Sequence, residues 1–175
     1  FSHMGIFSLF LLRPLILAIS SGLTFQSYEV RQEERTSMSL EPRKAVSAQD
    51  GFSLDFDLRI RYRDCFGYLF RFIDENLNHI DLVSNHNASQ YSFSLGNPDG
   101  ILAKVEIAVE HPYSWKHLSL RCSTDTVSLS IDGCRWVLPS APLRLGTFNL
   151  FFGSVDHERY GVHDIPYFTL KNLVL

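Results

Sequence analysis

The polar segment 155–164 (VDHERYGVHD) gathers the side chains best suited to recognise a ligand. Carboxylates, imidazoles and a guanidinium can exchange hydrogen bonds with sugar hydroxyls, and a tyrosine ring offers a flat surface for stacking. Because recognition often resides in loops on a rigid scaffold, we interpret this segment as a candidate ligand-binding loop. Its candidate contact residues are Asp156, His157, Arg159, Tyr160, His163 and Asp164. The alternative interpretation is a solvated connector.

Two tryptophans could add a stacking platform for a sugar ring. Trp136 follows a tight turn, and we include it among the candidate ligand contacts. Trp115 opens an alternating stretch, which favours a place in the core.

The segment 74–81 (DENLNHID) concentrates oxygen-bearing side chains. Ca²⁺ prefers oxygen ligands, so Asp74, Asn76 and Asn78 are candidate metal ligands and calcium is the candidate cofactor. The spacing of an EF-hand is absent. Asp and Asn are also ordinary residues of hairpin turns, and turn formation is the competing interpretation.

Length and charge narrow the function classes. A chain of 175 residues suits one domain. Its net charge is −3, and acidic and basic residues are interleaved, so no basic surface is expected to attract nucleic acid. The three cysteines, Cys65, Cys122 and Cys134, are too widely spaced for a zinc motif and are interpreted as small hydrophobic residues.

Alternation of apolar and polar residues dominates the chain after Gly22. In FSLDFDLRIRY (52–62) the apolar residues share one parity, while Asp55, Asp57, Arg59 and Arg61 share the other. About a dozen such stretches predict strands, at 23–30, 36–42, 52–62, 66–74, 78–84, 91–97, 101–109, 115–122, 126–131, 134–138, 147–153 and 167–175. Strands with one apolar face each must pack sheet against sheet, so we predict an all-β, antiparallel two-sheet sandwich with jelly-roll or Greek-key connections.

The polar parity of strand 52–62 has two interpretations. Its four charged residues either pair with charges on neighbouring strands in water, which we favour, or form part of a binding face. A second local feature is Asp132-Gly133, which predicts a two-residue hairpin turn with Cys134 opposite Ile131.

The first 21 residues differ from the rest of the chain. Ser2-His3-Met4 resembles a cloning-vector remnant, and the apolar run that follows resembles a signal peptide ending near Ser20-Ser21-Gly22. We therefore divide the chain into 1–21, a vector remnant plus a signal peptide or N-terminal apolar segment, and a domain at 22–175. A signal peptide would imply an extracytoplasmic location, secreted, periplasmic or at the cell surface. An ordered N-terminal element and a membrane anchor are the alternatives, and membrane contact is expected only through this segment if it is uncleaved.

The order of the strand motifs resembles the laminin-G-like branch of the concanavalin A-like lectin and glucanase superfamily. The likeness rests on FSLDFDLRIR, GYLFRFID, HIDLVS, YSFSLGN, SWKHLSLRCSTDTVSLSIDG, LFFGS and FTLKNLVL, and covers about residues 22–175. The resemblance implies a jelly roll of two curved sheets. It also implies a non-catalytic module that binds glycans or another extracellular protein, often beside a calcium ion, and that forms part of a larger protein.

Glycosidases of the same superfamily carry E-x-D-x-x-E on one strand, and this motif is absent from the sequence. Glu106 and Glu110 share a parity, but Ala108 lies where the aspartate should be. Asp55 and Asp57 also share a parity, but Arg59 beside them would keep both ionised, which is unsuitable for a general acid. We therefore predict a binding module that is not an enzyme and that recognises carbohydrate. A protein-interaction or spacer module is the first alternative, and a glycoside hydrolase is the second.

Overall fold

The described part of this computed structural model comprises residues 28–30, 38–40, 51–62, 65–140, 148–152 and 166–174. It contains twelve strands and no helix, and hence no helix of the length and apolarity needed to cross a bilayer. The strands are β1 (Tyr28–Val30), β2 (Met38–Leu40), β3 (Phe52–Ile60), β4 (Gly67–Asp74), β5 (His79–Ser84), β6 (Gln90–Asn97), β7 (Gly100–Ala108), β8 (Lys116–Cys122), β9 (Thr126–Ile131), β10 (Cys134–Pro139), β11 (Phe148–Phe152) and β12 (Phe168–Val174). The prediction of an all-β chain is confirmed. The signal-peptide prediction falls outside the described residues.

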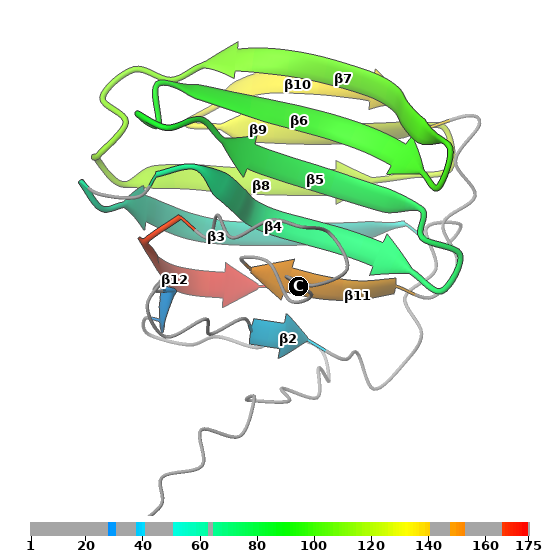
Figure 1. Cartoon of the computed structure of the whole chain (residues 1–175), viewed down its shortest axis with the longest axis horizontal. Helices are drawn as coiled ribbons and strands as arrows, with labels where there is room; N and C mark the ends of the chain where they lie inside the picture. Colours follow the sequence, from blue (N-terminus) through cyan, green and yellow to red (C-terminus); the bar gives the residue numbers. More distant parts are fainter. Residues whose placement is uncertain are drawn as a thin grey trace, which may run out of the picture.

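The strands form two six-stranded antiparallel sheets that pack face to face (Figure 1). Sheet A has the order β1-β12-β3-β8-β9-β10, and sheet B has the order β2-β11-β4-β5-β6-β7. In Figure 1, β4 to β7 form the front layer, and β3 and β8 to β10 lie behind them. The chain moves between the layers after β1, β2, β3, β7, β10 and β11, which gives the predicted jelly-roll sandwich.

The inward parity of β3 forms part of the core, as the alternating sequence predicts. Leu54, Phe56 and Leu58 are completely buried. The ring of Phe56 meets the rings of Phe70 and Phe152 edge to face, with centroids 6.1 and 5.4 Å apart. Because Phe70 and Phe152 belong to sheet B, these aromatic contacts join the two layers.

Two of the four outward charged residues of strand 52–62, Asp55 and Asp57, pair with neighbouring strands as the favoured interpretation expects. Arg121 on β8 donates to Asp55 at 2.8 Å, and His117 on β8 lies 2.9 Å from Asp57. Asn172 on β12 also donates to Asp57, at 2.6 Å. Partial burial alone raises the pKa of both carboxyls, but these hydrogen bonds and the nearby positive charges outweigh it and hold both pKa values below the usual range.

The Asp132-Gly133 turn has the expected geometry. Both residues have positive φ, 50° and 88°, and Cys134 lies opposite Ile131. All three cysteines are free thiols. Cys65 and Cys122 are buried, as expected for small hydrophobic residues, whereas Cys134 on the edge strand β10 is exposed.

The core position expected for Trp115 is wrong. Lys116 shares the inward parity of Leu118 and Leu120 at the start of β8, and its Nζ is satisfied there by the Asp132 carboxylate at 3.1 Å. Trp115 therefore has outward parity, and its ring lies beside the side chains of Arg59 and Lys171. Conversely, Trp136 is partly buried and packs against the core.

We expect the Asp57→Asn variant to lose less stability than the wild type when the pH is lowered. The pKa of Asp57 is lower in the folded protein than in the unfolded chain, where a carboxyl titrates near about 4. Its contribution is therefore present above that pH and is lost as the pH falls through the folded pKa. The contribution is below about 1 kcal/mol because the pair with His117 is partly exposed.

Urea unfolding at pH 7 and pH 3 measures this difference. The Asp57→Asn variant should lose less free energy of unfolding between the two pH values than the wild type. Ser130→Ala, which changes a hydroxyl on the same outer face, is the control and should behave like the wild type. An unchanged acid dependence in Asp57→Asn would contradict the pairing.

Candidate ligand-binding site

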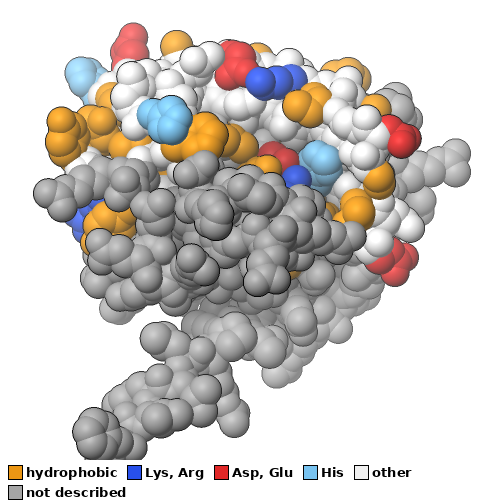
Figure 2. Space-filling model, viewed as in Figure 1, with side chains coloured by type: hydrophobic (Ala, Val, Ile, Leu, Met, Phe, Trp, Pro, Cys, Tyr) orange, Lys and Arg blue, Asp and Glu red, His pale blue; other side chains and the backbone are white. Residues whose placement is uncertain are grey.

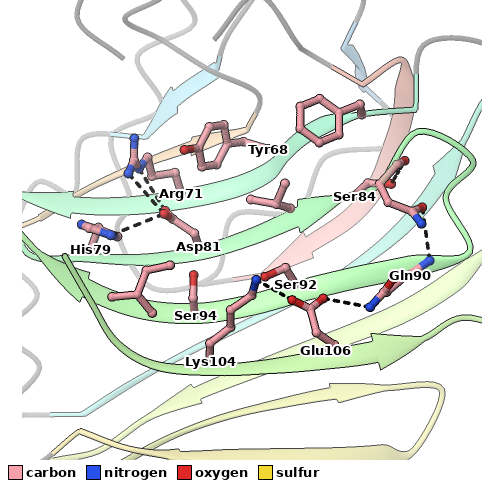
Figure 3. Close-up of a pocket in the computed structure, with 14 residues that line it drawn as sticks. Tyr68, Arg71, His79, Asp81, Ser84, Gln90, Ser92, Ser94, Lys104 and Glu106 are labelled. Atoms are coloured by element: carbon pink, nitrogen blue, oxygen red, sulfur yellow. Dashed lines mark hydrogen bonds and ion pairs between the residues drawn. The ribbon is translucent and has the colours of Figure 1, made fainter. Parts of the chain in front are cut away.

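The outer face of sheet B carries a hollow of about 350 Å³ that crosses β4, β5, β6 and β7. Figure 2 shows this face, where an acidic, a basic and a histidine side chain lie together and a second acidic–basic pair lies nearer the top. Figure 3 shows the lining at close range. Its polar and aromatic members include Phe66, Tyr68, Arg71, His79, Asp81, Gln90, Ser92, Ser94, Lys104 and Glu106.

A β-bulge in β4 brings an aromatic ring to this hollow. Tyr68 pairs with Val83 and Phe70 pairs with Leu82, so Leu69 is the extra residue, and both Leu69 and Phe70 are completely buried. The bulge reverses the parity of the strand, and Tyr68 consequently lies on the same face as Arg71. The Arg71 guanidinium carbon lies 4.7 Å from the centroid of the Tyr68 ring.

A second bulge shapes the opposite wall of the hollow. The pairing of β6 with β7 shifts between Leu95, which faces Ala103, and Gly96, which faces Ile101. Ile101 and Lys104 both line the hollow as a result, whereas Ala103 packs against the core.

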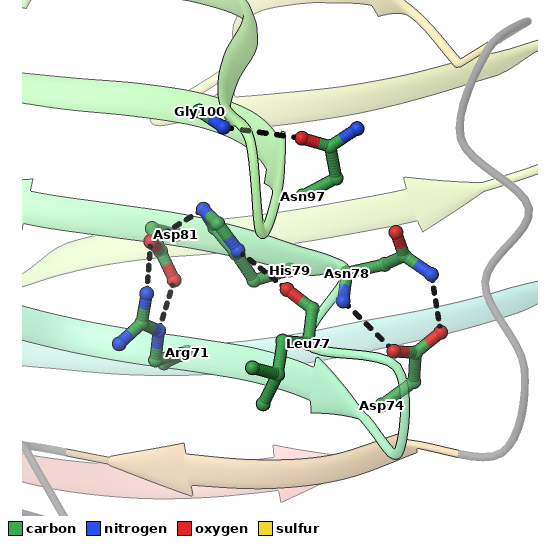
Figure 4. A network of polar contacts seen from close by, with 8 residues as sticks. All are labelled: Arg71, Asp74, Leu77, Asn78, His79, Asp81, Asn97 and Gly100. Carbon is green, nitrogen blue, oxygen red and sulfur yellow. Dashed lines mark hydrogen bonds and ion pairs between the residues drawn. The ribbon is translucent and has the colours of Figure 1, made fainter. Parts of the chain in front are cut away.

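Arg71, Asp81 and His79 form the most buried polar cluster of the hollow (Figures 3 and 4). Arg71 donates through Nε to Asp81 Oδ1 at 2.9 Å and through its terminal nitrogen to Oδ2 at 3.2 Å, a bidentate pair. Burial raises the pKa of the Asp81 carboxyl, and the Arg71 and His79 side chains oppose this effect. His79 Nδ1 lies 3.0 Å from the carbonyl oxygen of Leu77, which only accepts, so Nδ1 carries a proton. His79 Nε2 points to Asp81 Oδ2, 3.7 Å away.

Gly96 provides the room that the His79 ring occupies. The two residues are direct partners in the pairing of β5 and β6. A Cβ atom on Gly96 would lie only 2.3 Å from His79 Nε2 and 2.6 Å from its Cε1. The absence of a side chain at this position therefore allows the ring to lie across the sheet.

A second ion pair lies farther along the hollow. Lys104 Nζ contacts Glu106 Oε1 at 2.5 Å, and the Gln90 side-chain amide donates to Glu106 Oε2 at 3.2 Å. Ser92 faces Glu106 across the sheet, and Ser94 faces Lys104. Each guanidinium or ammonium group of the lining is thus matched by a carboxylate, with hydroxyls between them, and the surface suits an uncharged ligand with many hydroxyl groups.

The predicted metal ligands lie in the β4–β5 turn (Figure 4). Asp74 Oδ1 accepts hydrogen bonds from the backbone N–H groups of Asn76 and Asn78, at 2.9 and 2.8 Å, and Oδ2 accepts one from the Asn78 side-chain amide at 2.9 Å. These are the contacts of a turn, and a metal ion would have to displace them. No three acidic, histidine or cysteine side chains of the described ranges converge as a metal site. Calcium at Asp74, Asn76 and Asn78 stays a prediction.

Of the predicted ligand contacts the structure describes only Trp136, which does not line this hollow. Trp136 lines a different groove of about 290 Å³, which Ile107 and Val109 of sheet B also line. Asp156, His157, Arg159, Tyr160, His163 and Asp164 lie outside the described residues and stay predictions.

The hollow itself was missed from the sequence. The sequence pattern that could have indicated the hollow is the set of polar residues with outward parity on four consecutive strands. Examples are His79 and Asp81 on β5, and Ser92 and Ser94 on β6. Other members of the lining cannot be found from strict alternation, because in β4 this pattern gives Tyr68 and Arg71 opposite parity.

Comparison with known proteins shows similarity in structure alone. No protein family model and no curated protein sequence matches the chain. Among solved structures, domains LG4-5 of the mouse laminin alpha1 chain match with a TM-score of 0.62 and 12% identity, over 91% of this chain and 46% of that chain. This chain therefore spans about half the length of the laminin structure.

Two further structures are similar over most of this chain. The binding domain of botulinum neurotoxin DC in complex with SialylT has a TM-score of 0.60 at 11% identity, over 84% of this chain and 37% of that chain. The Bacteroides ovatus mixed linkage glucan GH16 protein in complex with a G4G4G3G product has a TM-score of 0.55 at 12% identity, over 79% and 73%. The chain thus has the concanavalin A-like jelly-roll fold that laminin LG domains, GH16 glucanases and this neurotoxin domain share.

Proposed function

We propose that this chain is a non-catalytic carbohydrate-binding module that holds a neutral saccharide in the hollow on sheet B. The observation that carries this proposal is a hollow whose acidic and basic side chains are paired and whose remaining lining is mostly hydroxyl, amide and aromatic, with Val83 and Ile101 as aliphatic members. A saccharide offers hydroxyl groups that donate and accept hydrogen bonds, together with apolar C–H faces. A protein-interaction or spacer module, the first alternative, needs no such hollow.

Specific groups of the lining have suitable roles. Tyr68 and Phe66 supply aromatic surface at the wall formed by β4 and the residues before it. The Ser92 hydroxyl and the Glu106 carboxylate supply a donor and acceptors across neighbouring strands. These groups stand on strands of a sheet, so little conformational entropy is lost when a ligand binds. The neurotoxin domain and the Bacteroides ovatus protein each hold a carbohydrate in their structures, and this supports carbohydrate as the ligand class.

The carboxylates of the hollow are poorly placed for hydrolysis. Asp81 and Glu106 are separated by two strand spacings and two register positions, which puts their Cα atoms about 12 Å apart. Glycoside hydrolases hold the carboxyl groups themselves about 5 to 9.5 Å apart, so these two side chains would have to turn toward each other to reach that range. Each carboxylate also faces a cation, Arg71 or Lys104. We therefore rank a glycoside hydrolase below a binding module, and release of reducing ends from mixed-linkage glucan would reverse this order.

We also propose that the module works outside the cytoplasm as one part of a larger protein. The support is the apolar run after Met4 and its small residues at Ser20-Ser21-Gly22. N-terminal sequencing of protein exported by a secreting host tests this proposal, and cleavage near Gly22 is the expected result.

Blocking the hollow should abolish saccharide binding. Ser92→Tyr places a large side chain on the central strand β6 without changing the core, and we expect no measurable affinity. Glu106→Gln removes a charged acceptor, and we expect the dissociation constant to become about ten-fold larger. A glycan array identifies the neutral oligosaccharide, and isothermal titration calorimetry measures its affinity.

The matched control places the same bulk on the other sheet. Ser130→Tyr lies on the outer face of β9 and should bind like the wild type. Equal binding by Ser92→Tyr and Ser130→Tyr would place the ligand elsewhere, and an array without any bound glycan would refute the proposed function.

We expect the Gly96→Ala substitution to displace the His79 side chain, which lines the hollow. The added methyl group overlaps the His79 ring and also lies 2.9 Å from the Gly100 carbonyl oxygen. The variant should be about 1 to 3 kcal/mol less stable, with shifted imidazole NMR signals of His79 and weaker saccharide binding. Adding His79→Ala should recover part of the stability because the ring is removed. Unchanged His79 signals in Gly96→Ala would show that the ring does not lie over Gly96.

A further inference from the structure

The outer face of sheet A holds an indole ring between two cationic side chains. The Arg59 guanidinium carbon lies 4.8 Å from the centroid of Trp115, and Lys171 Nζ lies 4.1 Å from it. Both distances are within the range of cation–π attraction. Two positive charges are thereby held close together on one ring.

Three neighbouring segments converge at this point. Arg59 on β3 pairs with Thr169 on β12, and Lys171 lies two positions farther along β12. Trp115 directly precedes Lys116, the partner of Leu58, and so extends the pairing of β3 with β8 to Arg59. The three side chains therefore stand on adjacent strands of a rigid sheet.

Within the described ranges, neither of these two cations forms an ion pair with a carboxylate. The neighbouring carboxylates on this face are engaged elsewhere, Asp55 with Arg121 and Asp57 with His117 and Asn172. The positive charge of Lys171 does help to lower the pKa of Asp57, so the two groups are near each other without direct contact.

The inner side of the Arg59 guanidinium lacks support, because its Nε atom makes no hydrogen bond to a described residue, and only the terminal nitrogens of the group can face a ligand. This atom is buried and has no hydrogen-bond partner within the described part of the chain. Buried N–H groups are normally satisfied, and an unsatisfied one costs about 1 to 3 kcal/mol. An oxyanion could accept from the guanidinium and the ammonium group at once and relieve the repulsion between them.

We propose that Arg59, Lys171 and Trp115 form a second binding site, which takes a sulfate or carboxylate group of an acidic saccharide. Thr169, beside Arg59, is almost completely buried and accepts a hydrogen bond from Arg61 Nε at 3.2 Å, so it supports the site from beneath and is not a ligand contact. The Ser130 hydroxyl lies farther along the same face on β9, and hydroxyls suit a saccharide better than an acidic peptide. The hollow on sheet B differs because each of its cations is paired with a carboxylate.

Titration followed by NMR tests this site in the intact chain. The protein has two tryptophans, so it gives two side-chain indole N–H signals, and Trp136→Phe assigns them. The probes are a heparin-derived sulfated hexasaccharide, trigalacturonate, neutral laminarihexaose, sodium sulfate and poly-glutamate. We expect a sulfated or uronate saccharide to shift the Trp115 signal, and laminarihexaose to leave it unchanged.

Arg59→Gln and Lys171→Gln should each weaken that binding about ten-fold, because each removes a charge-assisted hydrogen bond. Arg135→Gln is the matched control. Arg135 lies on the same face but donates to the Ser128 hydroxyl at 3.1 Å, and its loss should change affinity less than two-fold. Ser92→Tyr, which blocks the hollow on sheet B, should still bind the acidic saccharide. The experiment therefore distinguishes an error in the proposed site on sheet A from an error in the proposed site on sheet B.

Three results would overturn the proposal. The first is equal weakening by Arg59→Gln, Lys171→Gln and Arg135→Gln, which would indicate unspecific attraction to a charged surface. The second is a response to sodium sulfate or poly-glutamate as strong as the response to the acidic saccharides. The third is a Trp115 signal that no acidic saccharide shifts.

Discussion

Burial of one face of each long strand is the constraint on which the rest of this structure depends. The aromatic contacts of Phe56 with Phe70 and Phe152 need both sheets to turn their apolar parity inward. Because side chains alternate along a strand, this choice sends every second residue to one of the two outer faces. Polar groups that are far apart in sequence, such as Arg71 and Glu106, consequently meet on a common surface. The binding faces are thus a result of how the core is formed.

Local departures from alternation then decide which residues share a face. The extra residue at Leu69 lets Tyr68 and Arg71 lie together, and the register shift after Leu95 does the same for Ile101 and Lys104. A bulge keeps the core intact while it reverses the parity of one part of a strand. In this chain both shifts occur at the walls of the hollow, where they bring an aromatic and a basic side chain toward the ligand space.

Features encoded by neighbouring residues were predictable from the sequence. The strand positions, the inward parity of Leu54, Phe56 and Leu58, and the Asp132-Gly133 turn follow from short-range patterns and from backbone sterics. The hollow was not predictable, because it depends on bulges and on which strands become neighbours. Trp115 was misplaced for a different reason: its apolar ring was weighed above its position, although Lys116, Leu118 and Leu120 share the inward parity and alternation therefore puts the indole outward.

The outer faces of the two sheets differ in how their charged side chains are paired, although both sheets have six antiparallel strands. On sheet B, Arg71 and Lys104 each have a carboxylate on the same or the adjacent strand, and a charged ligand would have to compete with these pairs. On sheet A, the carboxylates are taken by Arg121 and His117, which leaves Arg59 and Lys171 beside Trp115. Coulomb energies at a partly buried surface are several-fold larger than in water, so this difference favours ligands of different charge. The two outer faces of one sandwich can therefore present different charge to their surroundings while they share a single core.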